Sequence, residues 1–395
     1  MREKFTYATL VGLVAYSAIA TDLYLPALPD MTADFGVDHA AGQLSLSTFM
    51  VGIAFGQLIF GPLSDQYGRL PVVRLGTLLF LATSIACALA SSMEFMWLAR
   101  AAQGFAAASG PVIARAIVRD RYEGHRAAQV MATLGAAMAV VPLVAPTIGS
   151  WLLVWFDWRA TFLALAVFAL IVFAGLRLFS ESAPPPAQDR LSISGVLGSF
   201  GTFLGDRRFV GYQMVGTASF CAIFAFLSTV SYFMRDVFRV APENFGYAFA
   251  ISVSGYMIGS LSSSRLVPYL GPDNTMRTGT LLSTAAATGL FFAAGFDPVP
   301  VWVAATCSFS VFLGIGLTFA NAMMGAVSLY PKTAGAASAA YGFIHATSAA
   351  AVGVAAGHFY DGSLIPTTGI MLLCCLFACI GLWAAREHPS PRHAN

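Results

Sequence analysis

The chain has 395 residues, of which 57% are hydrophobic and only 10% are charged, and its formal net charge at pH 7 is +2. About a quarter of the residues of a soluble domain are charged, so this composition, with a mean hydropathy of +0.73, excludes a soluble globular protein. The net charge itself says little, because the distribution of Lys and Arg carries the information in a membrane protein.

Twelve runs of about 20 apolar residues, the length that crosses a bilayer core of ~30 Å, are separated by short polar connections. We predict spans at residues 7–28, 42–62, 71–91, 94–117, 128–152, 158–180, 209–233, 244–268, 274–295, 299–328, 334–358 and 364–386. The longest polar interruption, residues 181–208, separates six spans from six. The sequence therefore predicts an all-α integral membrane protein with two pseudo-symmetric six-helix bundles, residues 1–180 and 209–395, joined by a cytoplasmic linker at 181–208.

Positive residues divide unequally between the two predicted sides of the membrane. If the N-terminus is cytoplasmic, the outer loops and helix ends keep only Arg159, Arg235 and Arg239. Cytoplasmic loops carry the excess of Lys and Arg in membrane proteins. We therefore expect a multi-pass protein of a bacterial-type inner membrane with both termini in the cytoplasm.

The first predicted span contains a single carboxylate, Asp22, whereas every other Asp and Glu can be assigned to a loop or a helix end. A charge at bilayer depth costs at least about 2.5 to 3.5 kcal/mol. Such a residue persists only if it pairs, faces water or takes up a proton. We interpret Asp22 as the proton-carrying residue of a membrane transporter.

The connection between the second and third spans reads GPLSDQYGR, with Gly61, Asp65, Gly68 and Arg69 at the positions of a G-x-L-x-D-x-x-G-R pattern. This pattern resembles the loop between helices 2 and 3 of the major facilitator superfamily. The glycines allow a tight turn and close helix approach, Asp65 can lie against a helix N-terminus, and Arg69 can pair across the cytoplasmic seam. An ordinary polar turn with a topology-setting arginine is the alternative.

The fourth span contains RAAQG, which resembles the R-x-x-Q-G motif of proton-coupled members of that superfamily. At ~1.5 Å per residue, Asp22 lies about 24 Å above the start of its span, and Arg100, about 9 Å below the outer start of the fourth span, reaches the same depth. We therefore expect Arg100 to pair with Asp22 and to bias its protonation; a helix-clamping hydrogen-bond donor is the alternative. Arg115 lies near the inner end, where its side chain can snorkel, and is interpreted as structural.

The fifth span contains VVPLVAPTIGSW, where Pro146 and Gly149 match the antiporter motif G-x-x-x-G-P-x-x-G-G of exporting members. A kinked, closely packed helix is the alternative. Together with TDLYLPALPDM and the AIVRD that contains Arg119, the chain resembles the Bcr/CflA branch of drug:proton antiporters over its entire length. Some relatives carry a second acid where this chain has Val14. The resemblance implies proton-driven efflux of small amphipathic compounds, here with one acidic proton site.

Side chains that could line a substrate cavity are aromatic or weakly polar. Aromatic and methionine stripes more often pack helices than bind ligands, and a lone mid-span histidine more often hydrogen-bonds a neighbouring helix than relays protons. The candidates are Tyr24, Phe49, Phe220, Phe224, Asn321, Met324, Tyr341 and His345.

No signature of an enzyme is present. The six cysteines lie inside spans without zinc-ligand spacing, and HExxH, GxSxG and a GxxxxGK[ST] loop are absent. We expect no enzymatic activity, cofactor, metal or nucleic-acid partner; the expected partners of the monomer are a small-molecule substrate, protons and the lipid bilayer. An uptake symporter and a non-transporting receptor or scaffold are the rival interpretations.

Overall fold

The computed structural model describes residues 2–181, 193–296 and 298–385. The first half contains α1 (Arg2–Asp22), α2 (Leu28–Phe35), α3 (His39–Tyr67), α4 (Arg69–Ala88), α5 (Met93–Arg121), α6 (Gly124–Trp155) and α7 (Trp158–Gly175). The second half contains α8 (Ile193–Gly205), α9 (Arg207–Asp236), α10 (Phe245–Leu270), α11 (Pro272–Ala293), α12 (Val301–Ser328), α13 (Ala334–Phe359) and α14 (Ile365–Ala385). Single turns of 3-10 helix lie at η1 (Leu25–Ala27), η2 (Leu176–Leu178), η3 (Pro242–Asn244) and η4 (Pro331–Thr333). No strand occurs in these described ranges, as predicted.

The helices are long enough to cross a bilayer. Within the described residues, 10 helical segments are both long and apolar enough to do so. The helices α10 and α11, with 26 and 22 residues, have sufficient length, but their serines and threonines lower the hydropathy. With these two, the structure has the predicted twelve spans, and α8 is an additional helix within the predicted linker.

The first span is not the continuous helix predicted at 7–28. The helix α1 ends at Asp22, and the chain continues through η1 into α2 before it reaches Phe35. The cause is Pro26 and Pro29, which lack an N–H donor and are accommodated in the first turns of η1 and α2. The break places Asp22 at the end of a helix.

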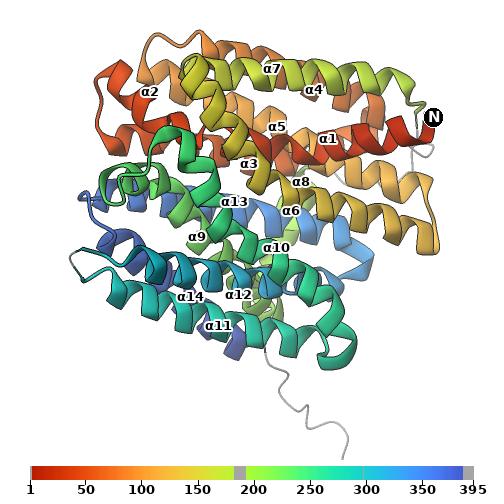
Figure 1. The fold of residues 1–395 in the computed structure, drawn as a ribbon. Coiled ribbons are helices and arrows are strands. Elements are labelled where there is room, and N and C mark those ends of the chain that lie inside the picture. The colour runs from red at the N-terminus through yellow and green to blue at the C-terminus, as the bar shows by residue number, and fades with distance from the viewer. Residues whose placement is uncertain (1, 182–192, 297, 386–395) are drawn as a thin grey trace, which may run out of the picture.

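The spans form two groups. The first group is built around α5, which packs against α1, α3 and α4, and the second around α9, which packs against α12, α13 and α14. In Figure 1, α4 and α7 lie on one side of the molecule and α11 and α14 on the other, while α3 packs on α13 and α6 on α10 between them. Two groups suit the predicted division into bundles, whose limits stay a prediction; residues 182–192 of the linker lie outside the described part.

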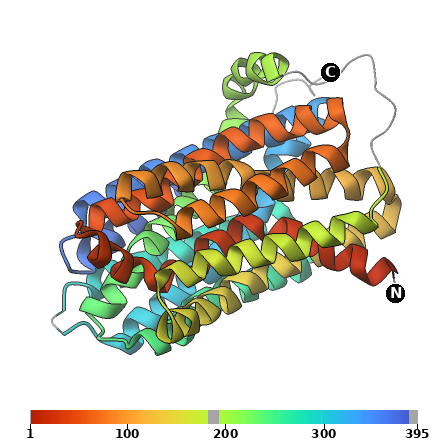
Figure 2. The same ribbon diagram turned by 90° about the horizontal axis from the view of Figure 1, so that it is seen from above.

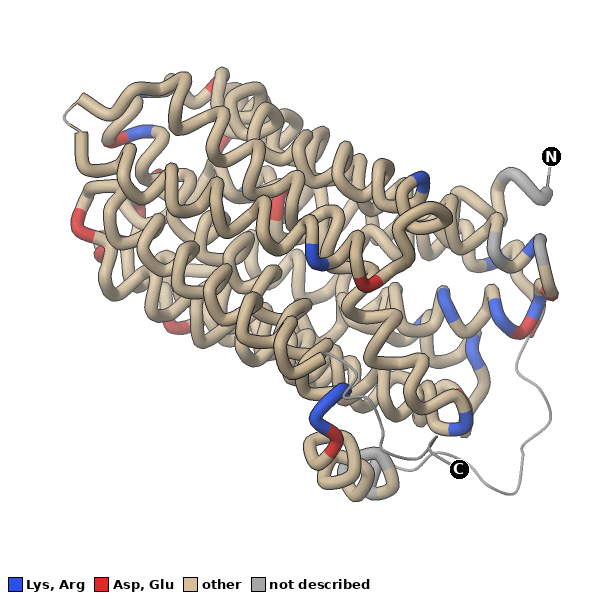
Figure 3. The backbone as a smooth tube through the Cα atoms, turned by 90° about the horizontal axis from the view of Figure 1, so that it is seen from below, with Lys and Arg blue, Asp and Glu red and all other residues tan. Residues whose placement is uncertain are grey.

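The two ends of the molecule differ from its middle. We call the end where α1 begins and α14 ends the terminal end, and the other the opposite end (Figure 2). Charged residues gather toward these ends and are sparse between them (Figure 3). At the terminal end α8 packs on α13 and α9, where Phe203 stacks on Phe209 with ring centroids 5.3 Å apart.

The helices α6 and α1 approach closely at Gly149. A Cβ atom at this position would overlap the carbonyl oxygen of Leu23, next to Asp22. Gly149→Ala should therefore lower the free energy of unfolding by about 1 to 3 kcal/mol, because backbone atoms must move. The measurement is the thermal unfolding midpoint of the purified protein. Gly198→Ala on α8, where nothing lies within 4 Å of the added Cβ, is the control; equal midpoints for the two variants would contradict the close contact.

Candidate functional site

A cavity of about 290 Å³ lies between the two groups of helices. It is lined by α1, α3, α5 and α6 from the first group and by α9, α10, α12 and α13 from the second. Most lining side chains are apolar; the polar ones are Ser17, Thr21, Asp22, Gln57, Tyr256, Ser260 and His345. Asp22 is the only carboxylate among these lining residues, so one potential negative charge faces an otherwise neutral cavity.

Asp22 is 4% exposed and lines the cavity at the end of α1. Among the described residues, its side chain forms no ion pair and no hydrogen bond, although Thr21 beside it donates to the carbonyl oxygen of Ser17. A buried carboxylate without a cation is costly unless it is neutral or meets a charged ligand. The side chain is therefore placed to exchange a proton for a positively charged group.

Arg100 reaches the predicted depth but not the predicted partner. The Nη1 group donates to the carbonyl oxygen of Ala20 at 3.1 Å and to Oε1 of Gln103 at 2.6 Å, and Nε donates to the carbonyl oxygen of Ser45 at 3.4 Å. Ala20 is two residues from Asp22 along α1, so the guanidinium lies close to the level of that carboxylate. No Arg100–Asp22 ion pair forms within the described residues, because the guanidinium is turned toward backbone carbonyls.

Two of the aromatic residues predicted to line the cavity, Tyr24 and Phe49, contact Arg100 instead. The Arg100 guanidinium lies 4.4 Å from the ring centroid of Tyr24 and 4.2 Å from that of Phe49. Both rings are fully buried, and neither lines the cavity. Cation–π contacts of a desolvated guanidinium are stabilising. Tyr24 and Phe49 thus join Arg100 in a clamp between α5, α1 and α3.

Of the remaining cavity candidates, Phe220 and His345 line the cavity. Their ring centroids are 4.0 Å apart, and Nδ1 of His345 is buried without a hydrogen-bond partner among the described residues. The other four do not line it. Phe224 and Tyr341 are buried in helix packing, Asn321 donates to Ser263, and Met324 is 68% exposed.

One wall of the cavity was not predicted from the sequence. Phe249, Val253, Tyr256 and Ser260 of α10 line it at spacings of three and four residues, which is one face of a helix. That periodicity was available in the sequence. It was missed because α10 contains no charged residue at depth to draw attention to it.

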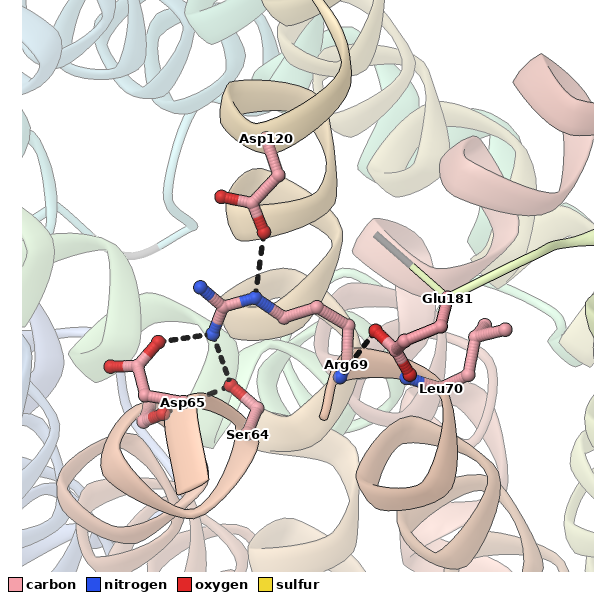
Figure 4. Close-up of polar contacts among 7 residues, drawn as sticks. Ser64, Asp65, Arg69, Leu70, Asp120 and Glu181 are labelled. Atoms are coloured by element: carbon pink, nitrogen blue, oxygen red, sulfur yellow. Dashed lines mark hydrogen bonds and ion pairs between the residues drawn. The ribbon is translucent and has the colours of Figure 1, made fainter. Parts of the chain in front are cut away.

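The GPLSDQYGR connection forms a charged network at the terminal end (Figure 4). Arg69 is 5% exposed; it pairs with Asp65 through Nη1 and with Asp120 of α5 through Nε at 2.8 Å. Glu181 accepts the backbone N–H groups of Arg69 and Leu70 at 2.9 and 3.0 Å. All of these contacts lie within the first group of helices, where they hold α3, α4 and α5 together.

The same network corrects the expected position of Asp65. Glu181, not Asp65, lies at the N-terminus of α4, where a carboxylate is favourable. Gly68 has a φ of 96°, which favours glycine at the junction of α3 and α4. At Gly61 a larger side chain would fit, because an added Cβ would lie 4.0 Å from its nearest neighbour, Val112.

Asp65→Asn should weaken the network without reaching the cavity. We expect slower turnover and an altered distribution of conformations, while the dissociation constant of a transported dye stays within a few-fold. Dye binding and distance measurements between labels at the terminal end check both. Asp361→Asn, in a loop at the opposite end where the side chain bonds only Ser363, is the control. A collapse of affinity with an unchanged distribution would show that Asp65 does not act through the network.

The remaining predicted motif residues lie on α5 and α6. Pro146 is inside α6, one turn before Gly149. Arg115 and Arg119 are both exposed, and Nε of Arg115 donates to the carbonyl oxygen of Pro111 at 2.9 Å. No cluster of three or more potential metal ligands occurs among the described residues.

The two groups of helices also touch at the opposite end. Arg235 of α9 pairs with Asp30 of α2 at 2.8 Å, and the hydroxyl of Ser231 donates to the carbonyl oxygen of Leu25 at 2.5 Å. The rings of His39 and Tyr232 lie 4.4 Å apart. These contacts join the two groups of helices at the opposite end.

Comparisons with known proteins agree with this architecture. The family model described as Major Facilitator Superfamily matches residues 10–354. A solved structure, of a bacterial homologue to the human lysosomal transporter Spinster in an inward-facing and occupied conformation, superposes with a TM-score of 0.70 at 14% identity and covers 98% of this chain and 99% of that one. The likeness at this identity concerns the fold.

Curated relatives match over most of the chain. The bicyclomycin resistance protein homologue of Haemophilus influenzae is 27% identical, and the match covers 96% of this chain and 95% of the relative. Multidrug resistance protein D of Escherichia coli is 28% identical, and the match covers 84% of this chain and 83% of the relative. The uncharacterised MFS-type transporter YdgK of Bacillus subtilis is 29% identical, and the match covers 87% of this chain and 86% of the relative.

Proposed function

Because the chain belongs to the major facilitator superfamily, we propose that it exports small amphipathic compounds or drugs across the cytoplasmic membrane in exchange for protons. The similarity to relatives named for bicyclomycin and multidrug resistance supports efflux. The observation that carries the coupling is Asp22, a carboxylate that pairs with no described residue and lines an apolar cavity. It is a transporter and not an enzyme on this account.

Coupling follows from competition for one carboxylate. Ionised Asp22 can hold a cationic group of the substrate, and a proton arriving from the acidic outer side displaces it. Arg100 fixes the end of α1 through the Ala20 carbonyl. Its Nη2 group is buried and makes no hydrogen bond with a described residue, so it is available to Asp22 in another conformation.

Alternating access requires the two groups to rock about the cavity. The closed opposite end, held by Asp30 and Arg235, would face outward, and the terminal end, with most Lys and Arg, would face the cytoplasm. In this proposal residues 1–180 and 209–395 move as two bundles of a monomer joined by the linker at 181–208.

An uptake symporter on the same fold is the second candidate, and the direction of transport decides between them. Purified protein in liposomes with an acidic interior should accumulate a permanently charged cation such as ethidium, because outward proton movement drives inward substrate movement. Protein-free liposomes control for passive partition. Accumulation only in liposomes with an alkaline interior would identify a symporter and overturn the proposal.

A further inference from the structure

Arg115 continues the face of α5 that lines the cavity. Ala108 and Pro111 line it, and Arg115, one turn after Pro111, lies on the same face of the helix. From Gln103 to Val118, Arg115 is the only exposed residue of α5, while this helix packs against α1, α3 and α4. The exposed side chain therefore faces the space between the two helix groups.

The guanidinium of Arg115 lacks a counter-ion. Its one hydrogen bond runs from Nε to the carbonyl oxygen of Pro111, and no carboxylate pairs with it in the described ranges of the chain. Asp65 and Asp120, two acids at this end, both bind Arg69. Both Nη groups of Arg115 thus remain free to bind a carboxylate with two parallel hydrogen bonds.

Asp22 and Arg115 lie at different depths. A Cβ at Gly110 of α5 would touch the carbonyl oxygen of Leu13 of α1, which sets these two residues at one level. Asp22 lies beyond Leu13 toward the opposite end and Arg115 beyond Gly110 toward the terminal end. At ~1.5 Å per residue the two Cα atoms are about 20 Å apart along the helices. This separation is far longer than an ion pair, so the two charged groups form separate subsites.

An aromatic surface lies between these subsites on the facing wall. The ring of His345 is 4.0 Å from the centroid of Phe220 and 5.2 Å from that of Phe319, and all three residues line the cavity. Flat aromatic molecules stack favourably on such rings. The cavity thus offers an anionic and an aromatic contact, and Arg115, one turn beyond the lining residue Pro111, adds a cationic one next to it.

Resting on the proposed export function, we propose that the preferred substrates are elongated zwitterionic amphipaths whose carboxylate binds Arg115 and whose aromatic body stacks near His345. The cationic group then lies on the Asp22 side. A carboxylate at Arg115 gains a charge-assisted hydrogen bond that a purely cationic amphipath cannot form. A substrate with a positive charge alone has no group that can bind Arg115, which pairs with no acid among the described residues.

The test compares rhodamine B with its ethyl ester. The two dyes share the cationic aromatic body, and only rhodamine B carries a carboxylate that is ionised at neutral pH. Fluorescence anisotropy of the full-length purified protein gives a Kd for each dye. The wild type should bind rhodamine B more tightly than the ester. Arg115→Gln should reduce the ratio of the two affinities about tenfold, and Arg115→Lys should restore part of it.

Arg177→Gln is the matched control, because it removes an exposed arginine at the same end on η2, outside the cavity lining. Its affinity ratio should equal that of the wild type. Absence of rhodamine B binding, equal wild-type affinities, or an unchanged ratio in Arg115→Gln would each overturn the proposal. Failure of the proposed function is distinct: the wild type would then move neither dye uphill in the pH-gradient assay, whatever the binding ratio.

Discussion

Asp22→Asn is expected to abolish uphill, pH-driven efflux. The asparagine keeps the shape of the side chain but cannot take up and release a proton, so substrate movement loses its driving force. Some binding and downhill exchange should remain, because the apolar lining of the cavity is unchanged. The measurement is dye accumulation in liposomes with an imposed pH gradient.

Asp22→Glu and Ser17→Ala are the controls for this effect. The glutamate retains a titratable carboxyl group and should keep part of the uphill activity, and Ser17 lines the same cavity without a charge. If Asp22→Asn still concentrates dye against its gradient, Asp22 is not the proton-carrying residue.

Arg100→Ala should destabilise the folded protein strongly. The change removes the donors to the carbonyl oxygens of Ala20 and Ser45 and to Gln103, all of them buried. Hydrogen bonds from a charged group contribute about 1.5 to 3 kcal/mol each, and unsatisfied buried acceptors add a penalty. We expect a loss of about 3 kcal/mol or more, read from the thermal unfolding midpoint. Arg100→Lys should recover part of it, because an ammonium cannot match the forked donor.

The same variant separates a clamp from an ion-pair partner. If Arg100 acts as a clamp, the midpoint of proton-linked dye release in a pH titration stays near that of the wild type while the unfolding midpoint falls. If it pairs with Asp22 during the cycle, its removal favours the protonated acid and moves the release midpoint to higher pH. An Arg100→Ala protein with wild-type thermal stability would contradict the clamp.

Depth in the membrane could be predicted from the sequence, and direction around the helix could not. The fixed rise per residue placed Arg100 near the level of Asp22, and its guanidinium contacts Ala20, two residues from Asp22. The guanidinium nevertheless turns toward Ser45 and the rings of Tyr24 and Phe49. The neighbour that a side chain contacts depends on the rotation of its helix and on the packing of other helices. The sequence of a single helix does not determine either.

Interaction partners that lie far apart in the sequence could not be predicted for the same reason. Asp65 and Arg69 lie four residues apart in one motif, and the sequence singled out both. Asp120 and Glu181 complete the network from α5 and from the start of the predicted linker, at distances along the chain that no local pattern connects. Prolines were more informative: Pro26 and Pro29 marked the end of α1, although the predicted span continued past it.

The most direct test of the central claim is substrate-induced proton release by the purified protein in weak buffer, followed with a pH indicator dye. Addition of ethidium to the wild type should release protons, up to one per bound cation, because the cation displaces the proton of Asp22. Asp22→Asn should release none while still binding dye. Equal release from both proteins, or none from a wild type that binds ethidium, would contradict a mechanism in which one carboxylate serves proton and substrate in turn.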